Sequence, residues 1–299
     1  MSIRFDGKVA IITGAGGGLS KEHALEFARR GAKVVVNDLG GNVDGSGASD
    51  AANEVVELIK SEGGEAIANG ASVTDRPAVQ AMVDEAHEKW GSVDILVNNA
   101  GILRDKTFHN VTIDDFNLVM DVHFQGTLNC THAVYPLMRE QGYGRIVSTS
   151  SSSGVYGNFG QSNYGAAKMA IVGLANTLKL EGQKYNVFSN VITPVAYTRM
   201  THGLMPEDFG KNLQPEYVTP AVIYLASEDA PNGVIMAAGA GVYSRIFVHE
   251  TMGINLGTGE DMTPENISAS WDKISDTEDA RALQNGGEQT IKFFELINK

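Results

Sequence analysis

The stretch Lys8-Val-Ala-Ile-Ile-Thr-Gly-Ala-Gly-Gly-Gly18 decides the fold of this chain. Its apolar start predicts a buried strand, its glycines predict a tight turn, and the apolar spacing over residues 24–28 predicts a helix after the turn. Strand, glycine-rich turn and helix in this order begin a dinucleotide-binding unit, in which a pyrophosphate lies at the helix N-terminus. We therefore predict that Gly14, Gly16 and Gly18 let the backbone approach a dinucleotide; a turn without ligand is the alternative.

Strand-type and helix-type patterns alternate along the rest of the chain. Helix-type patterns cover residues 49–62 and 116–138 and begin near 74, 164 and 220, and strand-type patterns end near residues 38, 73, 98, 148, 194 and 241. This alternation predicts an α/β fold, a Rossmann-type doubly wound parallel sheet that binds its ligand at the carboxyl ends of the strands. Because no linker composition interrupts it, we predict a single domain over residues 1–245.

Residues 246–299 are predicted to form a C-terminal helical extension. Thr263-Pro-Glu-Asn is typical of a helix start, and Ile267, Trp271 and Ile274 follow on one stripe. Such an amphipathic segment could cover the active site or a partner subunit. Packing onto its own domain is the alternative.

Asp38 falls at the end of the second predicted strand. An acidic side chain there accepts hydrogen bonds from the adenosine ribose and repels a 2′-phosphate. The position therefore favours NAD over NADP as cofactor, unless Asp38 is a solvated loop residue.

Ser151, Tyr164 and Lys168 form the candidate catalytic set. Tyr164 and Lys168 are four residues apart in a helix-type pattern, so their side chains should share one face. A nearby ammonium favours the phenolate, and we expect it to lower the pKa of Tyr164 from its usual value of about 10. Such a tyrosine exchanges a proton with an alcohol or ketone near neutral pH, and Ser151 can hold the substrate oxygen. An ordinary surface Tyr and Lys is the alternative.

The composition limits the compartment and the partners. The chain has 299 residues, 42% of them hydrophobic, and a net charge of −13, which argues against nucleic acid and anionic membranes as partners. Its single cysteine, Cys130, lies in an apolar stretch and is expected in the core of a protein from a reducing compartment, predicted as cytoplasmic. No metal site is expected.

Several motifs together resemble the short-chain dehydrogenase/reductase family over residues 5–245. They are Thr13-Gly14-x-x-x-Gly18, Asn98-Asn-Ala-Gly101, Ser151 and Tyr164-x-x-x-Lys168. The resemblance implies that Tyr164 is the acid/base, that Ser151 binds the substrate oxygen and that Lys168 binds the nicotinamide ribose. It also implies a cofactor site made of Gly14, Gly16, Gly18, Leu19, Asp38, Ser72, Val73, Asn99, Ala100, Gly101, Tyr164, Lys168, Pro194 and Thr198.

A closer resemblance is to one branch, the (3R)-hydroxyacyl-CoA dehydrogenase part of the peroxisomal multifunctional β-oxidation enzymes of type 2, which is related to 17β-hydroxysteroid dehydrogenases. It rests on residues 37–47, 121–123, 156–164, 205–208 and 215–217. This branch implies NAD-dependent interconversion of a 3-hydroxyacyl-CoA and a 3-oxoacyl-CoA by a homodimer or homotetramer. A hydroxysteroid or other secondary-alcohol dehydrogenase is the alternative enzyme, and a nucleotide-sensing or scaffold protein is the non-catalytic alternative.

The chain departs from the family pattern at four places, one of which is Pro194-Val195 in place of the common Pro-Gly. Ser20 replaces the last glycine of the turn, which predicts a looser contact between helix and pyrophosphate. Ser72 and Val73 stand where an Asp-Val pair usually meets the adenine, so one contact is lost. His123 stands where most of the family has the asparagine of the catalytic set, and it is either a proton-relay member or a hydrogen-bonded core histidine.

Overall fold

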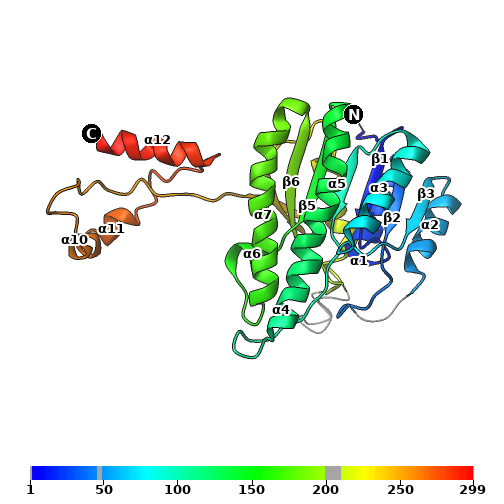
Figure 1. The fold of residues 1–299 in the computed structure, drawn as a ribbon, viewed down its shortest axis with the longest axis horizontal. Helices are drawn as coiled ribbons and strands as arrows, with labels where there is room; N and C mark the ends of the chain where they lie inside the picture. Colours follow the sequence, from blue (N-terminus) through cyan, green and yellow to red (C-terminus); the bar gives the residue numbers. More distant parts are fainter. Residues whose placement is uncertain (1, 46–48, 199–209, 299) are drawn as a thin grey trace. The chain divides into compact units, whose positions relative to one another are not determined.

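The computed structural model describes residues 2–45, 49–198 and 210–298, so residues 46–47 and 205–208 of the resemblance lie outside the described part (Figure 1). Within that part, eight strands form one sheet in the order β3-β2-β1-β4-β5-β6-β7-β8. The strands from β3 to β7 pair in parallel, which confirms the doubly wound sheet. Their bounds are β1 Val9–Thr13, β2 Lys33–Asn37, β3 Glu65–Asn69, β4 Ile95–Asn98, β5 Gly144–Thr149, β6 Val187–Pro194, β7 Ile235–Gly239 and β8 Val242–Ile246.

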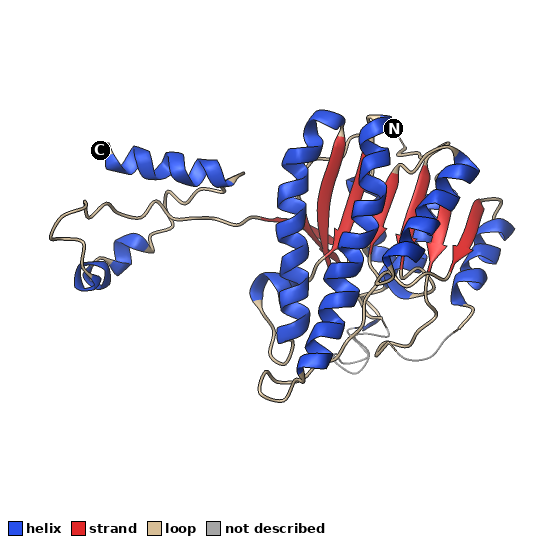
Figure 2. Ribbon diagram, in the orientation of Figure 1, coloured by secondary structure: helices blue, strands red, loops and turns tan. Residues whose placement is uncertain are grey.

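Helices cover both faces of the sheet, and Figure 2 shows the red strands with blue helices in front of them. On one face, α3 (Arg76–Trp90) packs on α5 (Gly126–Gln141), and α7 (Ser162–Gly182) packs on β6. On the other face, α1 (Gly18–Arg29) contacts both α2 (Ala51–Ser61) and α9 (Thr219–Leu225). The remaining short elements of this part are α4 (Ile113–Met120), η1 (Asp121–Gln125), α6 (Ser152–Tyr156), η2 (Gln183–Tyr185) and η3 (Pro215–Tyr217).

The core consists of two apolar layers, one on each face of the sheet. Successive side chains of β1 alternate between them, because neighbouring residues of a strand point to opposite faces. Ala10 and Ile12 pack in the layer that contains Phe27 of α1. Ile11 packs in the layer that contains Met82 of α3. Both faces are therefore sealed by helices, and the open part of the sheet is its carboxyl edge.

Cys130 lies in the second layer, as the sequence predicted for a core residue. Its side chain is 1% exposed. Burial raises the pKa of its thiol to about 12, so the reactive thiolate is scarce at neutral pH.

Three details of the secondary structure differ from the sequence prediction. The sequence predicts Thr74 as the N-cap of α3, but the helix is capped by Asp75, whose carboxylate accepts a hydrogen bond from the Ala78 N–H. The predicted long helix over 116–138 is interrupted by the π-helical turn η1. Strand β8 was missed; it returns through a two-residue turn in which Ala240 and Gly241 both have positive φ, 50° and 74°.

The chain divides into two compact units, residues 1–245 and 246–299. The second unit contains α10 (Pro264–Ala269), α11 (Trp271–Ile274) and α12 (Gly286–Ile297). Thr263 caps α10 by accepting a hydrogen bond from the Asn266 N–H, at the predicted helix start. Within this unit, the buried Lys292 ammonium donates to the Glu250 carboxylate and, over 2.7 Å, to the Thr251 carbonyl. Its predicted role as a cover stays a prediction.

Candidate active site

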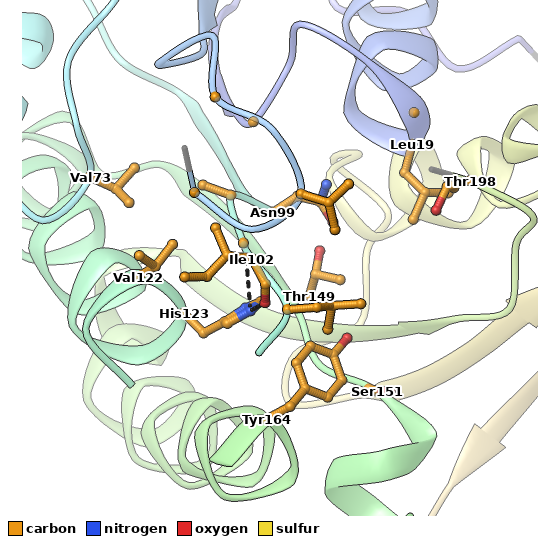
Figure 3. A pocket seen from close by; sticks show the side chains of 18 of the residues that line it. Leu19, Val73, Asn99, Ile102, Val122, His123, Thr149, Ser151, Tyr164 and Thr198 are labelled. Atoms are coloured by element: carbon orange, nitrogen blue, oxygen red, sulfur yellow. Dashed lines mark hydrogen bonds between the residues drawn. The ribbon is translucent and has the colours of Figure 1, made fainter. Parts of the chain in front are cut away.

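A cavity of about 690 Å³ opens at the carboxyl edge of the sheet (Figure 3). The loops that follow β1, β2, β4, β5 and β6 all reach it, as expected for a doubly wound sheet. Every residue of the predicted catalytic set lines it, and so do all predicted cofactor residues except Gly16. The structure therefore brings together side chains that are far apart in the sequence.

The glycine turn fits a pyrophosphate. Helix α1 begins at Gly18 with Gly17 as its N-cap, no side chain caps it, and no acidic residue occupies its first turn. Gly17, Gly18 and Leu19 line the cavity, so the first N–H groups and the positive end of the helix dipole are available to an anion. A Cβ on Gly16 would lie 2.7 Å from Ala51 Cβ, so the turn has no room for a side chain at that position.

The Asp38 carboxylate is held by backbone N–H groups on either side. Oδ2 accepts from Gly16 over 2.8 Å, and Oδ1 accepts from Gly40 over 2.7 Å. A carboxylate has about four acceptor positions, so these two bonds leave capacity for the hydroxyls of a ribose. Asp38 also lines the cavity, so a ligand bound there could meet its free acceptor positions.

Ser20 ties the turn to the sheet, and the predicted looser contact between helix and pyrophosphate stays a prediction. Its buried hydroxyl donates to the Thr13 carbonyl over 3.0 Å and accepts from the Asn99 amide over 2.7 Å. The Thr13 hydroxyl in turn accepts from the N–H groups of Asn99 and Ala100. A glycine at this position could make neither side-chain bond, so the serine fixes α1 against the loop after β4.

The remaining predicted cofactor residues occupy the cavity wall. Thr198 lies beside the glycine turn, since a Cβ on Gly18 would be 3.8 Å from its methyl group. Val73 is buried, and its carbonyl accepts from Asn129 over 2.9 Å. The Ser72 hydroxyl lies 2.8 Å from that of Thr74. Asn98 instead supports the sheet: its amide donates to Thr131 and Ser148.

Tyr164 and Lys168 lie on the same face of α7, at the end of β5. The Lys168 ammonium donates to the Thr149 carbonyl over 2.7 Å and is 5.5 Å from the centre of the Tyr164 ring. Ser151 caps α6 through its hydroxyl, which accepts from the Ser153 N–H over 3.1 Å. An ammonium has three donors, and Thr149 uses one of them.

The predicted lowering of the Tyr164 pKa is wrong for the protein without ligand. Burial raises the pKa of Tyr164, a hydrogen bond with Ser151 lowers it, and the charge of Asp105 raises it again. Burial also lowers the pKa of Lys168 to about 7, so this side chain is not a permanent cation. Desolvation of both groups therefore outweighs the attraction that the spacing suggested.

His123 is a buried, neutral side chain in the π-turn η1. Its Nε2 lies 2.8 Å from the carbonyl oxygen and 3.2 Å from the backbone nitrogen of Ile102 (Figure 3). The ring stands edge-on to Tyr164, with 5.1 Å between ring centres. Burial and the Lys168 charge lower the pKa of His123 well below its usual value. Its Nδ1 is buried without a hydrogen-bond partner among the described residues.

Gln161 is a cavity residue that the sequence did not indicate. Its amide donates to the Asp105 carboxylate over 2.6 Å, and its carbonyl accepts from Ser153 and Asn158. Gln161 lines the cavity, and Asp105 raises the pKa of Tyr164 from the same side. No local pattern could reveal this pair, because its members are 56 residues apart in the chain.

Neither a membrane-spanning helix nor a cluster of metal ligands is present among the described residues. Across residues 2–45, 49–198 and 210–298, no helix combines the length and the apolar character needed to cross a bilayer. In the same part of the chain, no group of three or more His, Cys, Asp or Glu side chains could hold a metal ion.

Comparisons with known proteins agree with this geometry. Residues 8–208 match the family described as short chain dehydrogenase. Relatives named peroxisomal multifunctional enzyme type 2, from Mus musculus and Drosophila melanogaster, are 45% and 46% identical over 99% of this chain. The chain covers 40% and 50% of their lengths, so it spans half or less of either relative.

Solved structures give the same result. The full-length peroxisomal multifunctional enzyme type 2 from Drosophila melanogaster superposes with a TM-score of 0.84 at 40% identity, covering 99% of this chain and 50% of that one. A 7α-hydroxysteroid dehydrogenase, complexed with NADH and 7-oxo glycochenodeoxycholic acid, gives 0.72 at 33% identity, covering 80% and 95%. The chain is thus an oxidoreductase that uses a nicotinamide dinucleotide, and it belongs to the short-chain dehydrogenase family.

Proposed function

We propose that this chain is an NAD-dependent dehydrogenase that interconverts a 3-hydroxyacyl-CoA and a 3-oxoacyl-CoA. The observation that carries the proposal is the meeting of Ser151, Tyr164 and Lys168 with the uncapped start of α1 in one cavity. The names of relatives matched over 99% of the chain support the acyl-CoA substrate class.

Each residue of the set has a defined task in this proposal. The Ser151 hydroxyl holds the oxygen at C3 of the substrate, and the phenol of Tyr164 gives that oxygen a proton in reduction or takes one in oxidation. The raised pKa keeps Tyr164 protonated in the ligand-free protein, ready to act as an acid. Lys168 holds a ribose hydroxyl with its remaining donors. The nicotinamide ring supplies the hydride chemistry when bound.

The cofactor preference is also a proposal. Asp38 faces the cavity one residue beyond β2, and its carboxylate would accept from the ribose of NAD. The same negative charge would repel the 2′-phosphate of NADP. We therefore propose that NAD is preferred.

A hydroxysteroid dehydrogenase is the second candidate. It is favoured by the solved relative that carries NADH and a 7-oxo bile acid. Absorbance at 340 nm, followed with NAD and a panel of 3-hydroxyacyl-CoA thioesters and hydroxysteroids, separates the two. Turnover of the thioesters with a kcat/KM at least about tenfold above that of every steroid is the expected result. A steroid that is turned over better would replace the first proposal by the second.

Assembly and compartment complete the proposal. We propose a homodimer or homotetramer, supported by exposed apolar side chains on the outer face of α7, Met169 at 42% and Leu180 at 48%. A monomer in light scattering at micromolar concentration would contradict it.

We also propose that residues 246–299 cover a site or a subunit, and truncation at residue 245 tests this. For location, the cytoplasm was predicted but several relatives are named peroxisomal, so imaging of a tagged chain decides.

A further inference from the structure

The loop over residues 39–45 forms one side of the cavity. Leu39, Gly41, Asn42 and Val43 line it directly after Asp38, where the ribose is expected. The loop is rich in glycine, and two of its glycines have φ values of 76° and 85°. Because glycine leaves an unbound backbone freer than any other residue, a loop of this kind needs external contacts to keep one shape.

Those contacts come from the segment after β4. The Leu103 N–H donates to the Val43 carbonyl over 3.0 Å. Arg104 binds Asp44, the next residue of the loop, through its guanidinium. Nε and Nη2 donate to the Asp44 carbonyl over 3.0 and 2.8 Å. The planar fork of arginine can make both bonds at once, which an ammonium cannot reproduce in the same geometry.

Arg104 is itself held by two elements on the substrate side of the cavity. Its Nη1 donates to the Asp115 carboxylate of α4 over 3.3 Å. Its backbone carbonyl accepts from the Asn163 amide over 3.0 Å, and Asn163 is the neighbour of Tyr164 in α7. The arginine therefore connects the cofactor loop to α4 and to α7, the helix that carries Tyr164 and Lys168.

We propose that Arg104 is a positioning residue for the dinucleotide: it holds the loop over residues 39–45 in the shape that receives the adenosine half. The inference deepens the proposed function and rests on the cofactor site at Asp38. Without the guanidinium, the loop would adopt more conformations and only a fraction of them would bind. The apparent affinity for the cofactor falls by that fraction.

Lys106 provides a matched control. It donates to the same Asp115 carboxylate over 3.2 Å, but no contact of Lys106 with the loop is present in the described residues. Both cations are partly exposed, and exposed ion pairs contribute little on their own. If substitutions at residues 104 and 106 change the NADH affinity differently, the difference is due to the hydrogen bonds to the Asp44 carbonyl rather than to the loss of a charge near Asp115.

The test is a fluorescence titration of the full chain with NADH. Arg104→Met should raise the dissociation constant about tenfold, as expected for the loss of two charge-assisted hydrogen bonds at a partly exposed site. Lys106→Met should stay within about twofold of the wild type, and Arg104→Lys should lie between. Hydrogen exchange should show faster exchange of the Gly45 amide, which donates to Asn42 within the loop, in Arg104→Met alone.

The outcomes separate this inference from the proposed function. Unchanged NADH affinity in Arg104→Met, with a wild type that binds NADH normally, overturns the inference and leaves the proposed function standing. Equal weakening by Arg104→Met and Lys106→Met assigns the effect to Asp115 and also overturns it. A wild type that binds no NADH overturns both. Unfolding midpoints of the two Met variants are compared to confirm that each is folded during the titration.

Discussion

The two sides of the cavity are built in different ways. The cofactor wall, residues 14–19 and 38–45, consists mainly of glycines, backbone N–H groups and the Asp38 carboxylate that two of these groups hold. The catalytic wall consists of the Ser151 hydroxyl and of three side chains whose pKa values are shifted by burial, those of His123, Tyr164 and Lys168. Binding on the first wall depends on backbone shape, whereas chemistry on the second depends on single atoms. Substitutions should therefore cost most on the catalytic wall.

The largest effect is expected for Tyr164→Phe. The substitution removes the hydroxyl that exchanges the proton but keeps the ring, so kcat should fall by about 10³ or more, while the affinity for NADH stays within about threefold. Tyr156→Phe is the matched control, because that side chain is 73% exposed. Steady-state kinetics and NADH titration of both variants measure the contrast. If the Tyr164→Phe enzyme keeps more than a tenth of the normal kcat, Tyr164 is not the acid/base of the reaction.

Asp38→Ala should change cofactor choice on the other wall. Removing the charge ends the repulsion of the 2′-phosphate, so the ratio of kcat/KM for NAD over NADP should fall about tenfold. Asp38→Asn removes the charge but keeps an acceptor for one of the two backbone N–H groups. Comparing it with Asp38→Ala therefore distinguishes the effect of the charge from the effect of losing the hydrogen bonds to the loop. If the wild type already prefers NADP, the assignment of Asp38 fails.

His123 tests whether every member of the catalytic wall supports the reaction or whether one of them only packs. His123→Ala removes the contacts with Ile102 and the ring of Tyr164, and should lower kcat about fivefold more than it raises KM. His123→Asn, the commoner family residue, keeps a polar group at this position and should keep most of the activity. Both kcat per folded molecule and thermal unfolding are measured. Normal kcat with reduced stability in the alanine variant would make His123 a packing residue.

The last comparison concerns stability and pH rather than activity. Burial lowers the pKa of Lys168 from 10.5 to about 7. Between these values the unfolded chain binds more protons than the folded one, so the contribution of Lys168 makes the free energy of unfolding rise with pH and become constant below about 7. Lys168→Met should lose this slope while other groups titrate as before. Equal slopes for wild type and variant in urea titrations from pH 7 to 10 would show that the buried lysine keeps its ordinary pKa.

The two walls also differ in how far the sequence predicts them. Gly14, Gly18 and Asp38 could be placed in a cavity because a strand, a turn and a helix follow one another locally and fix the backbone. The shifted pKa of Tyr164 could not be predicted, because it depends on burial by elements distant in sequence and on the charge of Asp105. Spacing shows that Lys168 is near, but not that both groups are desolvated.

The same reason explains the other misses. The π-turn at His123 and the bond between Gln161 and Asp105 depend on contacts made across the fold, and no local pattern marks them. The two partners of the Ser20 hydroxyl, Thr13 and Asn99, likewise belong to segments that no local pattern joins. Strand β8 follows a two-residue turn without the usual Asn-Gly or Asp-Gly signal, so it was not separated from β7.

The buried thiol of Cys130 gives the molecule an internal reporter of its own opening. A thiol reagent needs both access and a thiolate, and the folded chain provides neither in quantity at this single cysteine. Cys130 belongs to α5, and its side chain is buried in the apolar layer between that helix and the sheet. Its labelling rate therefore measures how often α5 moves away from the sheet. Anything that binds the folded state should slow the labelling in proportion to its occupancy, so the cysteine can register a cofactor or substrate that has no optical signal.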